Sequence, residues 1–294
     1  MRVSLGRKLF NAANYTFLIL FLLSIIVPFM HIISVSISDS REVTGMNVTV
    51  FPKGFNFGAY QEILQTKVFK QSLLNTVYVT AATTFFGLLF SVMAAYALTK
   101  QFFGKKVINY IYLITMYFTG GLIPTYLLVS KYMGLRNTLL ALILPNLILF
   151  FYIIILRSQI QEVPDSLLES ARIDGANEFQ VLFHVVIPSI SATLAAVGMF
   201  IALGAWNSWF NVMVFNDSRD MWMLQYYLRL IITDKSLTQG VDAQRIDQTA
   251  GMMQLTPEQF QMAAVILVAL PIVFIYPFVQ KYFASGLLVG AVKG

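Results

Sequence analysis

The chain alternates between long hydrophobic runs and shorter polar segments. A helix needs about 20 consecutive apolar residues to cross a bilayer. Runs of about that length predict six membrane-spanning helices, at residues 15–37, 71–98, 107–130, 138–156, 190–215 and 261–281. None of these six runs contains Asp or Glu. The pattern therefore predicts an all-α integral membrane protein.

The polar segments between the runs differ in charge and length. Basic residues concentrate before the first run and in the short segment after the second, at Arg2, Arg7, Lys8, Lys100, Lys105 and Lys106. Short segments rich in Lys and Arg stay on the cytoplasmic side. Both termini and segments 99–106 and 157–189 are therefore predicted to be cytoplasmic, and loops 38–70, 131–137 and 216–260 to lie outside.

Composition supports the membrane class and narrows the chemistry. Hydrophobic residues make up 57% of the chain and charged residues 12%, against about 45–50% and about 25% in soluble domains. The sequence has no cysteine, which excludes disulfides, thiolate zinc sites and cysteine nucleophiles. The net charge of +6 is explained by basic residues that set topology, so no nucleic-acid partner is predicted.

Glycine and proline residues interrupt the segment after the first run, which indicates a boundary near residue 70. The first run lacks a small-residue cleavage signature and is expected to stay as an anchor. We predict a first transmembrane helix with its extracytoplasmic loop at 1–70, the main transmembrane domain at 71–283, and a cytoplasmic C-terminal tail at 284–294.

The cytoplasmic segment 157–189 has the pattern of two short helices joined by a hinge. Pro164 suits the first helical turn, and Gly175 suits the left-handed conformation that ends a helix. Asn177 and Gln180 have the spacing of a capping box that opens the second helix. Pro188 limits this second helix. We therefore expect a compact helix-turn-helix.

The first of these two helices is amphipathic. Its apolar residues Leu167, Leu168 and Ala171 share one face, and its charged residues Glu169, Arg172 and Asp174 lie elsewhere. Such a helix suits docking to a protein or lying on lipid headgroups. Helices on a lipid surface usually carry Lys and Arg on their polar face. Five carboxylates accompany two arginines in this segment, so the pattern favours a protein partner.

Residues in this segment match a known motif at fixed spacing. Glu169-Ser170-Ala171, Gly175 and Ile187-Pro188 resemble the E-A-A-x3-G-x9-I-x-L-P loop of permease subunits of binding-protein-dependent ABC importers. Ser170 replaces an Ala of that motif, Val185 its Ile and Ile187 its Leu. The resemblance extends over most of the chain and is closest to maltose-type sugar permeases, especially those for complex oligosaccharides or polysaccharide fragments. It is carried there by Asn75-Thr76, residues 94–98, Asn137-Thr138, Trp206-Asn207 and residues 286–294.

The resemblance implies a type I ABC importer permease, a subunit of a bacterial cytoplasmic-membrane transporter that forms half of a carbohydrate pathway. Its coupling loop to the ATPase would comprise Leu167, Leu168, Glu169, Ala171, Asp174, Gly175 and Pro188. The expected partners are a second permease subunit in a heterodimer, two cytoplasmic ATP-binding subunits, an extracytoplasmic solute-binding protein and membrane lipid. The chain has no G-x-x-x-x-G-K-[ST] segment. ATP and Mg are therefore expected in the partner subunits, with no cofactor, metal or catalytic residue in this chain.

Aromatic and amide side chains in the spans are candidates for the sugar pathway, because sugars stack on aromatic faces and hydrogen-bond to amides. The candidates are Tyr112, Tyr117, Phe118, Trp206, Asn207, Trp209 and Phe210. Tyr and Trp also form belts at the membrane interfaces, so lipid contact is the alternative for each. Gly120, Gly121 and Pro124 are expected to let the third helix bend.

Three other functions fit parts of the pattern. An ABC permease for a non-sugar solute would share the cytoplasmic motif. An ion-coupled secondary transporter usually places acidic residues inside the bilayer, and the predicted spans have none. A membrane-embedded enzyme would need a catalytic motif, and neither H-E-x-x-H nor G-x-S-x-G occurs in the sequence.

Overall fold

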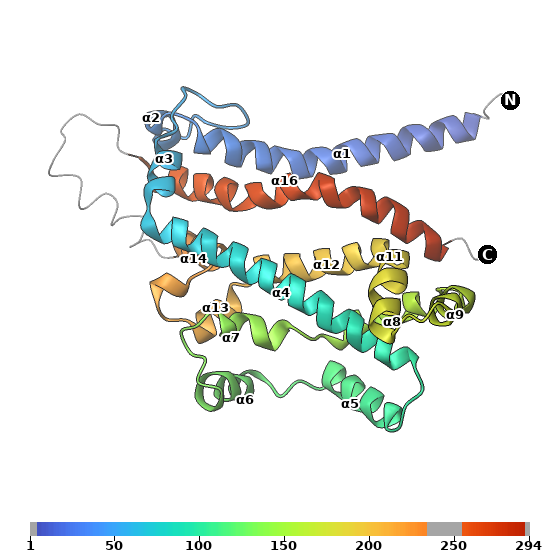
Figure 1. The fold of residues 1–294 in the computed structure, drawn as a ribbon. Coiled ribbons are helices and arrows are strands. Elements are labelled where there is room, and N and C mark those ends of the chain that lie inside the picture. Colours follow the sequence, from blue (N-terminus) through green and yellow to red (C-terminus); the bar gives the residue numbers. More distant parts are fainter. Residues whose placement is uncertain (1–4, 234–254, 292–294) are drawn as a thin grey trace. The chain divides into compact units, whose positions relative to one another are not determined.

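The computed structural model describes residues 5–233 and 255–291, and all regular secondary structure within them is helical (Figure 1). The predicted all-α class is confirmed. The chain divides into two compact units, residues 1–66 with 228–270 and residues 67–227 with 271–294. The predicted functional division at residues 70 and 283 stays a prediction. Part of the predicted outer loop 216–260 and the last three residues lie outside the described residues.

Three helices are long and apolar enough to cross a membrane without a break. They are α1 (Leu5–Ser36), α4 (Lys67–Thr99) and α16 (Pro257–Ala291), and the apolar part of α16 is Pro257–Pro277. With a rise of 1.5 Å per residue, α4 is about 50 Å long, which exceeds the ~30 Å hydrocarbon layer. α16 stays helical to Ala291, so most of the predicted tail at 284–294 continues the last span.

Three further spans are bent pairs of helices. The first joins α5 (Lys105–Tyr117) to α6 (Leu122–Tyr126) and a π-helical turn (Leu127–Tyr132) at 113°. The second joins α7 (Leu140–Ile143) and a 3-10 turn (Leu144–Asn146) to α8 (Phe150–Ile160) at 48°. In the third, residues Glu178–Ser189, which precede the predicted fifth span, lead into α12 (Ser191–Trp206) through a bend of 86°. With each bent pair taken as one span, the described residues contain six candidate spans, as predicted.

The breaks have local causes. The bend in the third span follows the extended residue Phe118 and Gly121, whose φ is +87°, and this confirms the expected bend. Pro145 cannot donate a helical hydrogen bond, and α8 begins only at Phe150. The prediction of a continuous helix over 138–156 is therefore wrong.

The prediction of one helix over 190–215 is also wrong. α12 ends at Trp206, and α13 (Phe210–Phe215) begins after a gap. At the end of α12 the side-chain nitrogen Nδ2 of Asn207 donates to the carbonyl oxygen of Leu203 at 2.9 Å. Polar side chains that bond to the local backbone in this way compete with continuation of the helix.

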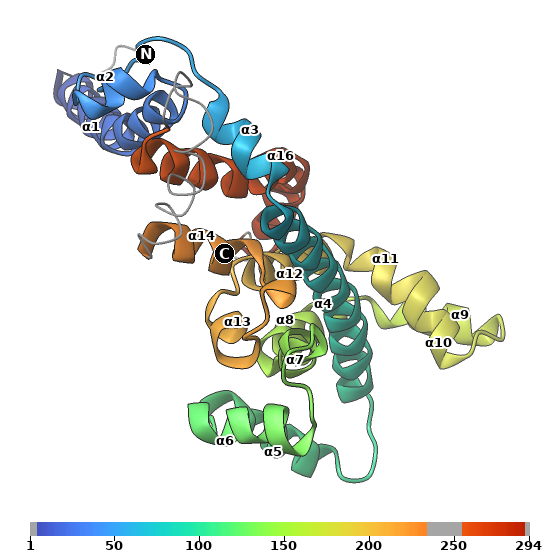
Figure 2. The same cartoon turned by 90° about the vertical axis from the view of Figure 1, so that its left-hand side faces the viewer.

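The core of the second unit forms where α4 packs against α8 and α12 (Figure 2). Glycines allow this close packing. A Cβ atom at Gly198 of α12 would lie 2.9 Å from Leu88 of α4, and one at Gly87 would lie 3.3 Å from the carbonyl oxygen of Leu147. Gly198 therefore serves a close contact with α4 inside this subunit.

In the first unit, buried polar contacts fix the segment that follows α1. Gln259 is fully buried, accepts a hydrogen bond from Ser40 Oγ at 2.7 Å and donates to the carbonyl oxygen of Ser38. Ser40 begins α2 (Ser40–Thr44), and α3 (Gly58–Gln65) follows. His31 Nδ1 lies 2.7 Å from the carbonyl oxygen of Thr49. The His31 side chain therefore contacts the loop after α1.

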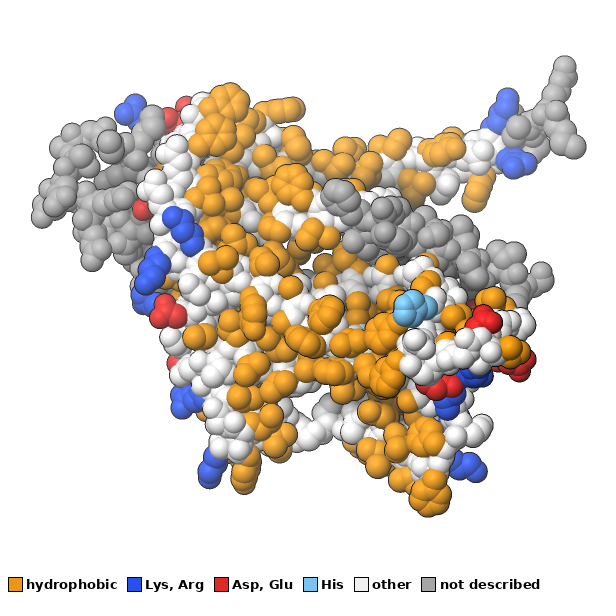
Figure 3. Space-filling model, in the orientation of Figure 1, with side chains coloured by type: hydrophobic (Ala, Val, Ile, Leu, Met, Phe, Trp, Pro, Cys, Tyr) orange, Lys and Arg blue, Asp and Glu red, His pale blue; other side chains and the backbone are white. Residues whose placement is uncertain are grey.

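Large apolar side chains cover the outer faces of the helices. Phe17 on α1 and Phe85 on α4 are more than 60% exposed. Figure 3 shows hydrophobic side chains over much of the visible surface and charged side chains mainly toward its margins. Such a surface suits contact with lipid chains.

Candidate functional site

The predicted helix-turn-helix is present, and we call residues 165–189 the elbow. Its first helix is α9 (Asp165–Ile173). Pro164 occupies the N-cap position, so the helix begins one residue later than predicted. Gly175 has φ of +86°, the left-handed conformation that L-residues with a Cβ rarely adopt. The predicted hinge at Gly175 is therefore confirmed.

The second helix of the elbow begins with the predicted capping box. Asn177 Oδ1 accepts from the Gln180 backbone N–H at 2.9 Å, and Gln180 Oε1 accepts from the Asn177 backbone N–H at 2.8 Å. Helical residues continue through α10 (Glu178–Val181), a π-helical turn (Leu182–Val186) and α11 (Ile187–Ser189). The elbow thus ends one residue after Pro188, and the 86° bend into α12 follows.

The elbow packs on the inner ends of the spans. Val181, Leu182 and Val186 are at most 3% exposed, and they share one hydrophobic core with α4, α8 and α12. Leu168 and Ala171 also pack against this core. In Figures 1 and 2, α9 and α11 lie close to each other. The elbow and these spans therefore share one packed core.

Four polar side chains join the elbow to the end of α4, and we call them the Glu178 cluster. The Glu178 carboxylate accepts a short hydrogen bond from the Tyr96 hydroxyl of α4. Its oxygens also lie 3.1 Å from Lys100 Nζ and 3.2 Å from Arg172 Nε. Lys100 Nζ lies 4.5 Å from the centroid of the Tyr96 ring. The cluster connects both helices of the elbow to the span.

The partners of Glu178 stabilise its charged form. The hydrogen bond from Tyr96 is the main cause, and Lys100 and Arg172 add to it, so the pKa of Glu178 falls from 4.5 to about 2. The Glu178 side chain is 56% exposed, and water therefore screens the two ion pairs. Tyr96, at 6% exposed, is the most buried of the three partners of Glu178.

The sequence reasoning missed Glu178, Tyr96 and Lys100 as parts of this site. Arg172 and Glu178 flank the Gly175 hinge with opposite charges, and that spacing was the available signal. Tyr96 lies in the stretch 94–98 that carries the family resemblance, but nothing local in the sequence pairs it with a residue 82 positions away.

The outer surface of the elbow combines apolar and acidic side chains. Of the predicted apolar stripe, Leu167 is 50% exposed, whereas Leu168 and Ala171 turn toward the core. Ile173 is 85% exposed and Phe179 63% exposed. The predicted coupling residues Glu169, Asp174, Gly175 and Pro188 are also exposed. Apolar and acidic side chains are therefore exposed together on the outer surface of the elbow.

The predicted pathway residues do not form one cluster. Tyr112 stacks on Phe150 with ring centroids 5.2 Å apart, and Trp206 is buried. Tyr117 and Phe118 are more than 70% exposed at the break of the third span. The other three residues, Asn207, Trp209 and Phe210, lie at the break of the fifth span. Asn207 Oδ1 accepts a hydrogen bond from Gln225 Nε2 at 3.0 Å. The rings of Trp209 and Phe210 meet edge to face. Their role in the pathway stays a prediction.

At the opposite end of α4 from Tyr96, polar contacts fix the segment that follows α13. Asn75 Nδ2 donates to the carbonyl oxygens of Asp220 and Trp222, and Thr76 Oγ1 accepts from the Leu224 backbone N–H at 2.8 Å. The Asn75-Thr76 pair noted in the sequence thus holds the start of α14 (Leu224–Thr233).

Asn137 makes a second contact with this segment. Its φ is +59°, and its Oδ1 accepts from the backbone N–H groups of Asp217 and Ser218 at 2.7 and 3.2 Å. Arg136 forms an ion pair with Asp217.

Among residues 5–233 and 255–291, no three His, Asp or Glu side chains gather as metal ligands would.

A sequence profile described as "Binding-protein-dependent transport system inner membrane component" matches residues 54–289. The chain is 35% identical to the polygalacturonan/rhamnogalacturonan transport system permease protein YtcP of Bacillus subtilis, over 98% of this chain and 99% of that protein. It is 36% identical to Protein LplC of the same organism, over 92% of this chain and 90% of that protein.

Solved structures match as well. One is a crystal structure of a bacterial ABC transporter involved in the import of the acidic polysaccharide alginate. A chain of it superposes with a TM-score of 0.90 at 31% identity, covering 96% of this chain and 99% of that chain. A second chain, from an alginate transporter complex, matches with a TM-score of 0.55 at 16% identity. This second match reflects the fold alone.

Proposed function

The chain belongs to the family of binding-protein-dependent transport system inner membrane components, and we propose that this permease subunit carries an oligosaccharide or polysaccharide fragment into the bacterial cytoplasm. The elbow is the single structural observation that supports the coupling part of this proposal. It presents Ile173 and Phe179 outward and holds Glu178 against the end of α4. In this proposal, a partner that binds the elbow and displaces it also moves α4.

The energy for transport comes from ATP and Mg bound in two cytoplasmic ATPase subunits. The chain itself has no phosphate-binding loop. In this proposal an ATPase subunit contacts the exposed apolar residues of α9 and α10. Leu167, Glu169 and Asp174 lie on the same elbow and form the rest of the contact.

The assembly contains a second, different permease subunit and an extracytoplasmic solute-binding protein. The family description, which names dependence on a binding protein, supports the latter. Both termini and the elbow lie on the cytoplasmic side. Lys100 lies in the short segment between α4 and α5, and Lys105 and Lys106 begin α5. These three basic residues support this orientation.

A carbohydrate cargo is supported by the relatives. YtcP is described as a polygalacturonan/rhamnogalacturonan permease, and the structure with the TM-score of 0.90 belongs to an alginate importer. Both names refer to polysaccharides. The six predicted spans contain no Asp or Glu but do contain amide and hydroxyl side chains, which suit hydrogen bonds to sugar hydroxyls. A non-sugar solute is the alternative cargo within the family.

The test is co-purification of the tagged chain from its native membranes with the ATPase subunit. Ile173→Asp places a charge on the exposed elbow and should reduce the recovered ATPase at least fivefold. Phe103→Asp is the control, because Phe103 is an apolar residue that is even more exposed than Ile173 and lies in the segment between α4 and α5. This change should leave recovery unchanged. Gly175→Pro should release or uncouple the ATPase as well.

A second assay identifies the cargo. ATP hydrolysis by the assembled transporter is measured with its binding protein and with oligogalacturonides, rhamnogalacturonan fragments or alginate fragments. Stimulation by one of these supports the carbohydrate proposal. A wild-type chain that purifies alone and transports solute without ATP would contradict the importer and favour an ion-coupled transporter.

A further inference from the structure

A non-helical loop, residues 46–57, joins α2 to α3 and folds back along the last turns of α1. Two side chains of α1 hold the loop there. His31 Nδ1 lies 2.7 Å from the carbonyl oxygen of Thr49, and Ser34 Oγ donates to the carbonyl oxygen of Val50 at 2.6 Å. Figure 1 shows the loop beside the end of α1 that leads into α2. The loop therefore has a defined place against this helix.

These contacts place the middle of the loop beside a candidate membrane span. His31 and Ser34 both belong to the span Gly6–Ser36. His31 lies five residues before the end of the helix, which is about 7.5 Å at a rise of 1.5 Å per residue. The carbonyl oxygen of Thr49 therefore lies beside the span rather than beyond its end.

The second half of the loop returns to the end of α1. The Asp39 backbone N–H donates to the carbonyl oxygen of Lys53 at 3.0 Å, and the Asn56 backbone N–H donates to the carbonyl oxygen of Ile37 at 2.9 Å. Lys53 is the one charged residue between positions 43 and 61. The part of the loop beside the span is therefore uncharged, and its single charge lies where the loop leaves the span.

The loop presents large apolar side chains to its surroundings. Met46, Phe51 and Phe55 are each more than 70% exposed. Val48 is buried instead and packs with Val35 of α1 in a small hydrophobic core. One buried side chain and two carbonyl contacts thus fix the loop to α1, and its aromatic side chains stay exposed.

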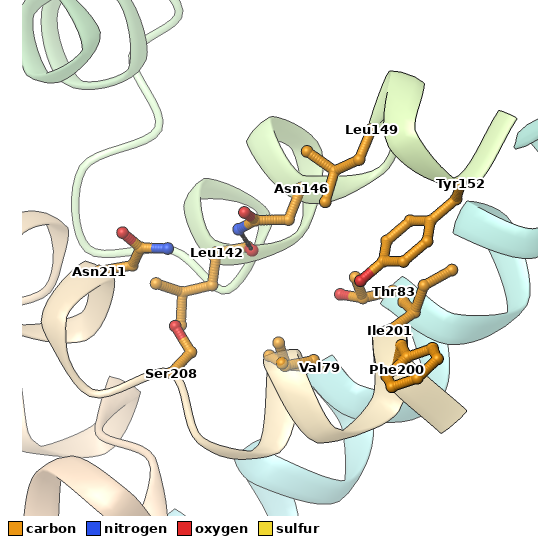
Figure 4. A pocket seen from close by; sticks show the side chains of 12 residues that line it. Val79, Thr83, Leu142, Asn146, Leu149, Tyr152, Phe200, Ile201, Ser208 and Asn211 are labelled. Carbon is orange, nitrogen blue, oxygen red and sulfur yellow. Dashed lines mark hydrogen bonds between the residues drawn. The ribbon is translucent and has the colours of Figure 1, made fainter. Parts of the chain in front are cut away.

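The irregular backbone limits how deep this loop can lie. Non-helical backbone at membrane depth is tolerated only where protein buries it or where it lines a water-filled cavity. The breaks of the second unit meet this condition, because Leu149 and Ser208 line a pocket together with residues of α4 and α12 (Figure 4). The 46–57 loop lies on the surface of α1 instead, where Thr49 and Phe51 are exposed. It therefore fits the headgroup layer, where water reaches its backbone, and not the hydrocarbon layer.

We propose that the 46–57 loop is a lipid-binding surface that rests in the headgroup layer of the outer leaflet, with Phe51 and Phe55 in contact with the acyl chains beneath it. The proposal rests on the orientation given above, in which loop 38–70 lies outside. Surface segments of this kind place Phe about 5–10 Å into the boundary between headgroups and acyl chains. Lys53 fits the same layer, because a lysine at the headgroup level pairs with lipid phosphate while its stem lies along apolar groups.

Phospholipid is the occupant that the geometry favours. A solute-binding protein arrives from water and meets surfaces beyond the ends of the spans, whereas this loop lies beside one. The apolar surface of the loop also continues on α1, where Phe29 and Ile33 are exposed. Exposed apolar faces of a span contact lipid chains. Lipid therefore meets the loop and the neighbouring face of α1 as one surface.

The sequence has no cysteine, so single reporter thiols can be introduced into the full chain. The assembled transporter with Phe51→Cys, labelled with a fluorophore, is placed in nanodiscs that contain lipid spin-labelled either near the headgroup or near the chain end. The label near the headgroup should quench this site about threefold more than the label near the chain end, because the loop is interfacial. Phe29→Cys on the span should be quenched by both labels. Arg41→Cys, on the exposed side of α2, should be quenched mainly by aqueous iodide.

Three results would contradict lipid binding. Stronger quenching of Phe51→Cys by iodide than by either lipid label would place the loop in water. Shielding of this site from both lipid labels only when the second permease subunit is present would assign the surface to that subunit. Shielding only after the solute-binding protein is added would assign it to that protein.

A separate measurement checks the orientation. A membrane-impermeant thiol reagent added to right-side-out membrane vesicles should modify Arg41→Cys in a chain that still recovers the ATPase subunit. Failure to modify it would overturn the proposed orientation and the outer-leaflet assignment together. Loss of lipid quenching at Phe51→Cys, with Arg41→Cys still modified, would overturn the lipid inference alone.

Removal of the His31 contact tests how the loop is held. In the Phe51→Cys background, His31→Ala should reduce the difference between the two lipid labels at least twofold, because the Thr49 carbonyl oxygen loses its donor. His31→Gln retains a donor and should keep the wild-type quenching. Ser24→Ala is the matched control, because Ser24 Oγ bonds the Phe21 carbonyl oxygen of its own helix and not the loop. Equal effects of His31→Ala and Ser24→Ala would contradict the fixed position of the loop.

Discussion

The hydroxyl of Tyr96 donates a hydrogen bond to the carboxylate of Glu178 across 82 residues of sequence. Tyr96 is 6% exposed at the end of α4, and Glu178 begins the second helix of the elbow. This bond joins the segment proposed to contact the ATPase to the end of a candidate membrane span. In the proposed coupling, movement of the elbow reaches α4 through this contact.

Removal of the Tyr96 hydroxyl should weaken that route. Tyr96→Phe leaves the buried ring in place and deletes the donor, so the free energy of unfolding should fall by about 1 kcal/mol. Cargo-stimulated ATP hydrolysis should fall as well. Thermal unfolding in detergent measures the first effect. Tyr78→Phe is the control, because Tyr78 is 56% exposed on the same helix, and an equal loss there would remove the special role of Tyr96.

Acid should remove the contribution of Glu178. Its pKa is lowered from 4.5 in the unfolded chain to about 2 by Tyr96, Lys100 and Arg172. The stabilisation is therefore complete above about pH 4.5 and is lost as the pH falls toward about 2. Thermal unfolding of wild type and Glu178→Gln from pH 7 to 2 should give midpoints that differ at neutral pH and converge in this window. A constant difference would contradict the assignment.

Gly175 should be sensitive to backbone conformation rather than to side-chain volume. Its φ is +86°, and a Cβ atom there would meet nothing within 4 Å. Gly175→Val should lower the free energy of unfolding by about 1–2 kcal/mol and reduce ATPase coupling. Gly175→Asn should lower it less, because Asn tolerates this conformation. Gly6→Ala, also with open space but at ordinary φ, should not destabilise. Unfolding and ATPase assays distinguish the variants.

Asn137 should contribute both conformation and hydrogen bonds. Asn137→Ala loses the bonds to the Asp217 and Ser218 amides and forces a less tolerant residue into φ of +59°, so it should cost about 2–3 kcal/mol. Asn137→Asp keeps the acceptor oxygen, so its free energy of unfolding should lie near that of wild type. Asn137→Gly should have a stability between those of Asn137→Ala and Asn137→Asp. Thermal unfolding that ranks the three variants otherwise would contradict this role.

Local features of the fold were predictable from sequence. The hinge at Gly175 and the capping box of Asn177 and Gln180 depend on residues within a few positions of one another, and both were predicted. The bend at Gly121 was predicted for the same reason. Hydrophobic run length indicated the six candidate spans because the bilayer sets one length for all of them.

Features that depend on distant residues were not predictable in this way. The breaks at 147–149 and 207–209 have local causes but lie inside apolar runs, so run length alone predicted continuous helices there. Leu168 and Ala171 have the spacing of an exposed stripe, yet they pack on the core because α4 and α8 lie beneath them. The Glu178 cluster likewise requires that α4 and the elbow meet in space.

The Glu178 cluster also limits how the elbow can be exchanged between related permeases. A chimera that received only residues 165–189 from a relative would carry a new docking surface but would keep the recipient's Tyr96 and Lys100. If the donor lacks a carboxylate at position 178, Lys100 and the Tyr96 hydroxyl lose their shared acceptor. A graft meant to redirect the subunit to another ATPase therefore has to transfer positions 96 and 100 together with the elbow.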